Sequence, residues 1–176
     1  MIAIVPVGVI PADVVTEVGT TVATNLHART VLAPGIALAP SAFDERRRQY
    51  SSTEILQTLA AVKHDEWERV LGVVDVDLYV PDLNFVFGEA DMARGVAVFS
   101  LARLRPSGSR QDASALFLKR AATEAIHELG HTYGLRHCRD PHCVMWFSNT
   151  LAESDRKGLD FCSAHASQLM MARRFS

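Results

Sequence analysis

The chain lacks a strong net charge of either sign. Its 176 residues include 18 Lys and Arg and 20 Asp and Glu, so the formal net charge is −2. This balance gives no reason to expect nucleic acid or an anionic membrane as a partner. The run of three arginines at 46–48 is too short to change that, and a solvated surface segment explains it better. With 48% apolar and 22% charged residues, the composition is that of an ordinary globular protein.

The sequence also lacks a long apolar run and a convincing signal peptide. Residues 1–10 are apolar, but no basic residue precedes them and Pro6 interrupts them, so we expect a buried strand there. No later stretch is long enough to span a bilayer. No linker, repeat or low-complexity tract divides the chain. We therefore expect a single domain over residues 1–176, located in the cytoplasm, with no membrane partner and with a monomer favoured.

Cysteine is scarce, and its placement is informative. Only three cysteines occur, Cys138, Cys143 and Cys162, and an odd number cannot pair completely within one chain. Cytoplasmic thiols also stay reduced. All three lie near histidines in the C-terminal part of the sequence. This clustering indicates metal binding before it indicates a disulfide.

Hydrophobic periodicity predicts alternating strands and helices. Val14, Val18 and Val22 recur at four-residue spacing, and Ser51 with Glu54 matches a capping box. The expected strands cover about 1–9, 29–33, 70–80, 85–87 and 95–104, with a turn at 88–91 and a loop at 105–110; the expected helices cover about 13–26, 51–62, 112–133 and 163–174. The pattern predicts an α/β (α+β) fold. Its parts are an N-terminal part over 1–134 and a small irregular C-terminal part over 135–176 that ends in a helix.

The most specific motif is HELGHTYGLRH at residues 127–137. His127 and His131, four positions apart on a helix, project from one face and can share a tetrahedral zinc ion. Gly134 suits the left-handed position that ends a helix, which lets His137 turn back as the third ligand. Three protein ligands leave a fourth position open for water, as in catalytic zinc sites. Glu128 lies beside the metal but outside its ligand set, where a general base is needed.

Further motifs extend this pattern. Cys138 follows directly, and CVM at 143–145 and CSAH at 162–165 come next; LNFVFGEA at 83–90 and SLARL at 100–104 precede it. Together these segments closely resemble the archaemetzincin (archaelysin) family of metzincin zinc metallopeptidases. The resemblance is specific from about Tyr79 to His165. It implies a metzincin-like fold, in which an N-terminal mixed twisted sheet and helices, including the active-site helix, precede a small C-terminal subdomain.

The resemblance also implies roles for individual residues. Two zinc ions per chain are implied, one catalytic and one structural. Met145 matches the methionine of the Met-turn, a hydrophobic floor beneath the catalytic zinc, although an ordinary core methionine would look the same. The structural zinc of the family is bound by four cysteines, whereas here the matching residues are Cys138, Cys143, Cys162 and His165. A Cys₃His set is a good closed zinc site. His142 is a rival for the fourth position, and free buried thiols are the remaining alternative.

By analogy with metzincins, the strand before the active-site helix is expected to be the sheet edge to which an extended substrate pairs. That strand is predicted at Gly95–Ser100, so Val96, Ala97 and Val98 are candidate substrate-binding residues. An ordinary internal strand is the alternative.

These observations predict a zinc-dependent hydrolase, and the resemblance narrows it to a peptidase acting on a peptide or protein substrate. Zinc would activate water, and Glu128 would accept its proton. Two alternatives stay open: a zinc amidohydrolase of a non-peptide substrate, and a non-catalytic zinc-containing binding module. Glu128 argues against the binding module, because metal binding alone does not require it.

Overall fold

The computed structural model describes residues 1–106 and 112–174, so most of the loop expected at 105–110 lies outside the described residues. Its main sheet has five strands in the order β2-β1-β5-β8-β7. Their bounds are β1 Ile2–Val7, β2 Thr30–Leu32, β5 Arg69–Val74, β7 Gly88–Asp91 and β8 Val96–Ser100. The first four strands in that order are mutually parallel, and β7 pairs antiparallel with β8 at one edge.

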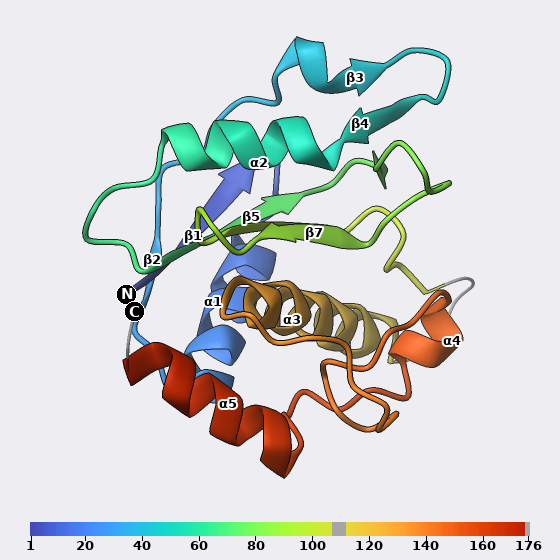
Figure 1. Cartoon of the computed structure of the whole chain (residues 1–176). Coiled ribbons are helices and arrows are strands. Elements are labelled where there is room, and N and C mark those ends of the chain that lie inside the picture. The colour runs from blue at the N-terminus through green and yellow to red at the C-terminus, as the bar shows by residue number, and fades with distance from the viewer. Residues whose placement is uncertain (107–111, 175–176) are drawn as a thin grey trace.

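A second, smaller sheet and the helices complete the fold. The small sheet has the order β3-β4-β6, with β3 Phe43–Asp44, β4 Gln49–Ser51 and β6 Leu78–Tyr79, and the 3₁₀ helix η1 (Pro40–Ala42) precedes it. The helices are α1 Ala12–Asn25, α2 Ser52–Ala61, α3 Ala113–Thr132, α4 Leu151–Ser154 and α5 Ser163–Arg174. Figure 1 shows α2 on one face of the main sheet and α1 and α3 on the opposite face.

Each face of the sheet has its own apolar core. Alternate residues of a strand point to opposite faces. Ile2 and Ile4 of β1 therefore pack toward α1 and α3, while Ala3 and Val5 pack toward α2. The predicted α/β (α+β) fold class is thus confirmed. Among the described residues, no helix combines the length and apolar character needed to cross a membrane.

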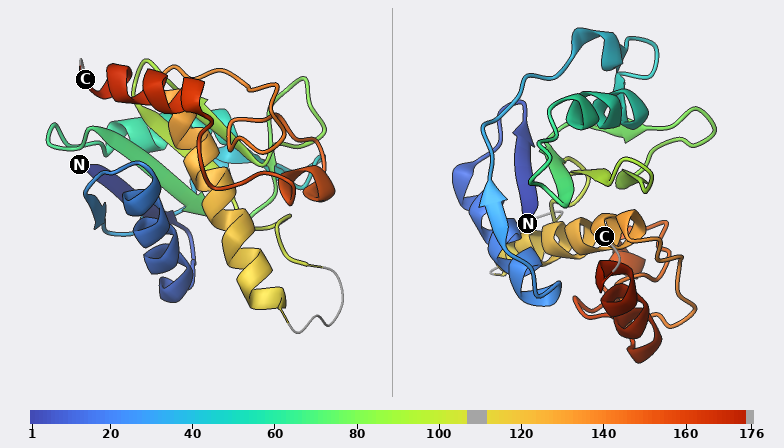
Figure 2. Two further views of the ribbon diagram at one scale, coloured as in Figure 1. Left: turned by 90° about the horizontal axis from the view of Figure 1, so that it is seen from below. Right: turned by 60° about the vertical axis from the view of Figure 1, so that its left-hand side comes forward.

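Helix α3 ends as its sequence indicates. Gly134 has φ +81°, a conformation that costs glycine little. The Leu135 N–H donates to the Gly130 carbonyl and the Gly134 N–H donates to the His131 carbonyl, which is the Schellman arrangement. The chain therefore turns back sharply toward α3. In both views of Figure 2, α5 lies beside the C-terminal end of α3.

Three element predictions were wrong. The segment Phe85–Phe87 is not a strand, and the turn expected at 88–91 is the edge strand β7. The strand expected at 70–80 is also divided into β5 and β6, which belong to different sheets. These differences place the edge of the main sheet one strand beyond the predicted position.

Candidate active site

Three histidines meet at the C-terminal end of α3. His127 and His131 are one turn apart on the helix, and His137 reaches the same point after the turn at Gly134. The candidate ligand atoms of these histidines all lie within 4.8 Å of one another. The rings of His127 and His137 are stacked with centroids 5.4 Å apart, and the ring of His131 is nearly perpendicular to both.

Hydrogen bonds orient the two helical histidines toward a common centre. Nδ1 of His127 donates to the Val144 carbonyl over 2.8 Å, and Nδ1 of His131 donates to the Leu135 carbonyl over 2.7 Å. Each Nε2 then carries a lone pair, and the two Nε2 atoms face each other at 3.1 Å. Two facing lone pairs repel unless a cation lies between them. Nitrogens on a tetrahedral zinc ion are separated by about 3.3 Å, so the observed spacing fits this metal.

The surroundings keep these imidazoles neutral. Burial lowers the pKa of all three, well below the ordinary value for His127. The Lys157 charge acts in the same direction on each of them. A neutral imidazole is the form that binds a metal ion. The site is therefore prepared for a cation near neutral pH.

Glu128 follows His127 on α3 and lines the same cavity. Only 6% of the residue is exposed. Burial, followed by the nearby Glu124 carboxylate, raises the pKa of Glu128 well above its usual value, while Lys157 opposes this shift. A metal cation among the histidines would also favour the ionised carboxylate. Burial thus favours the neutral form of Glu128, whereas a cation bound by the histidines would favour its carboxylate.

A second group of side chains that could bind a metal ion lies close to His137 in the chain. It consists of Cys138, Cys143, Cys162 and His165, whose candidate ligand atoms all lie within 4.8 Å of one another. The Sγ atoms of Cys138 and Cys162 are 3.8 Å apart, close to the roughly 3.8 Å between two thiolates on a tetrahedral zinc ion. Chiefly through a hydrogen bond from the His165 backbone N–H, the pKa of Cys162 is lowered to about 7, which favours the thiolate that a metal requires.

The fourth position of this group belongs to His165. Its Nδ1 atom is 3.2 Å from Cys162 Sγ and 3.7 Å from Cys143 Sγ. Its Nε2 atom donates to the Arg136 carbonyl over 3.0 Å. His142 is exposed and is not part of the group. Because Arg136 precedes His137, this hydrogen bond links the second group to the backbone of the third catalytic-site histidine.

Met145 lies beneath the histidine centre. It is fully buried, and its carbonyl accepts a hydrogen bond from the Cys138 backbone N–H over 2.8 Å. A Cβ atom at Gly130 would lie 2.4 Å from Met145 Sδ, so only glycine allows this close approach. The sulfur atom therefore packs directly on the helix between His127 and His131, and the position matches that implied for the Met-turn residue.

The three histidines open into a cavity of about 590 Å³. Two segments line it, 83–90 and 147–149, together with Lys157 and side chains from α3. Phe147 packs on His137 with ring centroids 4.8 Å apart. Ser148 Oγ is buried and has no hydrogen-bond partner among the residues that the structure describes.

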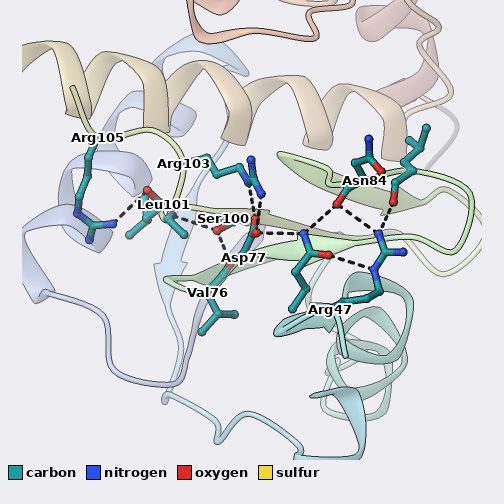
Figure 3. Close-up of polar contacts among 11 residues, drawn as sticks. Arg47, Val76, Asp77, Asn84, Ser100, Leu101, Arg103 and Arg105 are labelled. Carbon is teal, nitrogen blue, oxygen red and sulfur yellow. Dashed lines mark hydrogen bonds and ion pairs between the residues drawn. The ribbon is translucent and has the colours of Figure 1, made fainter. Parts of the chain in front are cut away.

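Polar side chains fasten the segment 83–87 that forms one cavity wall. Arg47 donates to the carbonyls of Leu83 and Asn84. Arg103 forms an ion pair with Asp77, and its guanidinium lies 4.1 Å from the centroid of the Phe85 ring. Figure 3 shows Arg47 directed at Asn84 and Arg103 directed at Asp77. A wall without regular secondary structure is thereby held in one position.

The sheet edge beside the cavity is β7, and the prediction that Gly95–Ser100 forms it was wrong. Val96, Ala97 and Val98 belong to β8, which is fully buried and pairs with β5 on one side and β7 on the other. Their backbone groups are already used within the sheet, so they cannot pair with a substrate. Segment 88–90 of β7 lines the cavity instead. The alternative of an internal strand is the correct one for β8.

Sequence analysis missed two buried charges in the cavity. Glu124 is 2% exposed and Lys157 is 1% exposed, and Lys157 Nζ lies 3.6 Å from Glu124 Oε1. The Ser154 hydroxyl donates to the same oxygen over 2.7 Å. Glu124 is one helical turn before Glu128, a spacing that could have indicated a shared face. No local pattern indicates Lys157.

A three-histidine centre with an adjacent buried glutamate, set in this fold, defines a zinc metallopeptidase. A family model for peptidase family M54 matches residues 11–171, and the chain belongs to that family. It is 37% identical over 169 residues to an archaemetzincin of Pyrococcus furiosus, covering 92% of this chain and 88% of that protein.

Solved structures agree with this assignment. The archaemetzincin of Methanopyrus kandleri superposes with a TM-score of 0.86 at 36% identity, covering 99% of this chain and 96% of that one. A zinc-dependent peptidase from Methanocorpusculum labreanum also gives a TM-score of 0.86, at 29% identity, with 96% and 100% covered. The agreement extends over almost the whole of this chain.

Proposed function

We propose that the chain cleaves peptide bonds by water attack, with Glu128 as general base and with zinc held by His127, His131 and His137. The observation that carries this proposal is the buried Glu128 carboxylate beside a histidine centre that opens into a cavity. When bound, zinc supplies a Lewis acid that activates water and stabilises the oxyanion. Glu128 accepts the proton from the attacking water and delivers it to the leaving amine.

We further propose that an extended peptide binds along β7. Within the described part of the chain this strand has a strand partner on only one side, and residues 88–90 border the cavity beside Glu128. An exposed strand edge offers backbone N–H and carbonyl groups to a peptide of any sequence. The two features together favour a peptide over a small amide as the substrate.

A second zinc ion, bound by Cys138, Cys143, Cys162 and His165, belongs to the same proposal. Its role is structural, because four protein ligands leave no position open for water. Reduced thiols are required for this set, which favours a cytoplasmic location. Division into parts over 1–134 and 135–176, and a monomeric state, stay predictions.

The test combines elemental analysis with a peptide-library cleavage screen on the wild type and on Glu128→Gln. We expect two zinc ions per chain in both proteins, and cleavage by the wild type only. Removal of the base should lower kcat by at least about 10²-fold. Unchanged turnover in Glu128→Gln would exclude Glu128 as the base. No cleavage of any peptide by zinc-loaded wild type would favour the non-catalytic binding module.

A further inference from the structure

A buried ammonium group lies in the catalytic cavity. Lys157 follows α4, is 1% exposed, and lines the same cavity as the three histidines and Glu128. Its ammonium group lies 3.6 Å from a carboxylate oxygen of Glu124, which lines the same cavity. A buried lysine is rare unless its charge has a partner.

Glu124, the ion-pair partner of Lys157, satisfies the hydrogen-bond donors of the ammonium group only in part. Glu124 Oε1 is 3.6 Å away, longer than a normal hydrogen bond, and that oxygen already accepts a hydrogen bond from Ser154. An ammonium group has three donors. In the same cavity, the buried Ser148 hydroxyl has no partner among the described residues. The cavity therefore presents donors that a ligand rich in acceptor atoms can satisfy.

The helix geometry indicates how far the Lys157 ammonium group lies from the bond that would be cleaved. Glu124, the partner of Lys157, is four residues before Glu128 on α3, about 6 Å along the helix axis. An extended peptide advances about 3.3 Å per residue. An offset of about 6 Å corresponds to about two residues of extended peptide, a distance that the side chain of a residue flanking the bond that Glu128 acts on can span. The rest of the cavity lining includes the apolar side chains of Phe85 and Phe147 as well as the polar residues Glu89, Ser148 and Asn149.

We propose that Lys157 selects substrates that carry a carboxylate next to the scissile bond. The carboxylate can be an Asp or Glu side chain, or the free C-terminal carboxylate of the peptide. This inference rests on the proposed peptidase function and names the substrate class. A charged hydrogen bond to Lys157 stabilises such a substrate, whereas an amide of the same shape leaves the ammonium group less satisfied and a basic side chain is repelled.

The test uses matched peptides that differ only in charge. One set places Glu or Gln at each position flanking the cleaved bond, and a second set ends in a free acid or an amide. The variants are Lys157→Met and the double variant Lys157→Met/Glu124→Gln. The double variant is needed because the single change leaves the buried Glu124 carboxylate without its countercharge and can destabilise the protein. Lys119→Met is the control, since Lys119 is exposed on α3 and does not line the cavity.

For the wild type and Lys119→Met we expect kcat/KM to favour the carboxylate member of one set by about tenfold or more. The set that responds identifies the source, side chain or C-terminus. In the double variant the preference should fall to near unity. Cleavage without preference, or a preference that survives in the double variant, would overturn the inference.

A binding measurement separates this inference from the proposed function. Dissociation constants for the same peptide pairs are measured on zinc-loaded Glu128→Gln, with and without the double substitution. Absence of cleavage by the wild type would contradict the peptidase proposal, but tighter binding of the carboxylate peptides that requires Lys157 would still support the inference. Equal dissociation constants for the two members of each pair would refute it.

Discussion

Gly88 should be essential because it lies against the proposed general base. It begins β7, and its Cα packs against the Glu128 side chain. A Cβ atom there would lie 2.6 Å from Glu128 Cγ and 2.6 Å from the Val98 carbonyl oxygen. Non-bonded carbon atoms prefer separations of about 3.5–4.0 Å. Gly88→Ala therefore requires a displacement of about 1 Å, either of Glu128 or of the β7 backbone.

Both displacements affect catalysis more than stability. Overpacking of this kind costs about 1–3 kcal/mol of unfolding free energy. A misplacement of about 1 Å at the reacting groups lowers the rate by about 10²-fold. We expect Gly88→Ala to be folded and to bind zinc, with kcat/KM reduced by roughly two orders of magnitude. The measurements are peptide cleavage, zinc content and urea unfolding.

Gly72→Ala is the matched control. A Cβ atom at Gly72 would lie 2.5 Å from Leu59 Cδ1, a comparable overlap in the apolar core on the other face of the sheet. This variant should lose stability and keep its turnover, because Leu59 can shift without moving the active site. If Gly88→Ala cleaved peptides within about threefold of the wild-type rate, the steric role of Gly88 would be refuted.

Three further predictions concern the surroundings of the site. Cys162→Ser should weaken zinc binding at the histidine centre, because the histidine centre and the Cys₃His group share the backbone around residues 136–138. Chelator competition measures this affinity, and an unchanged affinity would disprove the coupling. Arg47→Ala should raise KM by roughly three- to tenfold with kcat and zinc content retained, because Arg47 holds the cavity wall formed by segment 83–87. An unaltered KM would argue against this role. Metal-free Glu128→Gln should lose stability to urea as the pH falls below about 6.5. Desolvation lowers the pKa values of the three histidines in the folded protein, so the unfolded chain then binds more protons. A constant unfolding midpoint between about pH 7.5 and 5.5 would contradict this prediction. The Glu128→Gln background is used because the raised pKa of Glu128 acts on stability with the opposite sign.

The histidine centre could be predicted from sequence because its geometry is local. His127 and His131 share one helix, and the helical repeat alone brings them to one face. Gly134 marks the turn that returns the chain, and the structure gives it the expected positive φ. Little tertiary information is needed for such a site. The second group required a family resemblance, because Cys138 and His165 come together only through the folding of the C-terminal part.

The sheet edge could not be predicted in the same way. The sequence GEAD at 88–91 has the composition of a turn, and it is a strand only because it pairs with β8, Gly88 opposite Phe99 and Asp91 opposite Val96. A signal against the predicted edge was nonetheless present. Val96 to Phe99 is a continuous apolar run, as expected for a strand buried on both faces rather than one bordering a cavity.

His165 gives the second group a property that a fourth cysteine would not have. Because Nδ1 is directed at the thiols, the ring proton of His165 is on Nε2, and this N–H donates a hydrogen bond to the Arg136 carbonyl. A thiolate bound to zinc has no proton to donate, so it could complete the ligand set but could not make this hydrogen bond. Arg136 immediately precedes His137, which approaches the metal centre from outside α3 and is itself exposed. A zinc ion on the proposed Cys₃His set would thus fix the third histidine in two ways, through the adjacent Cys138 and through the hydrogen bond from His165.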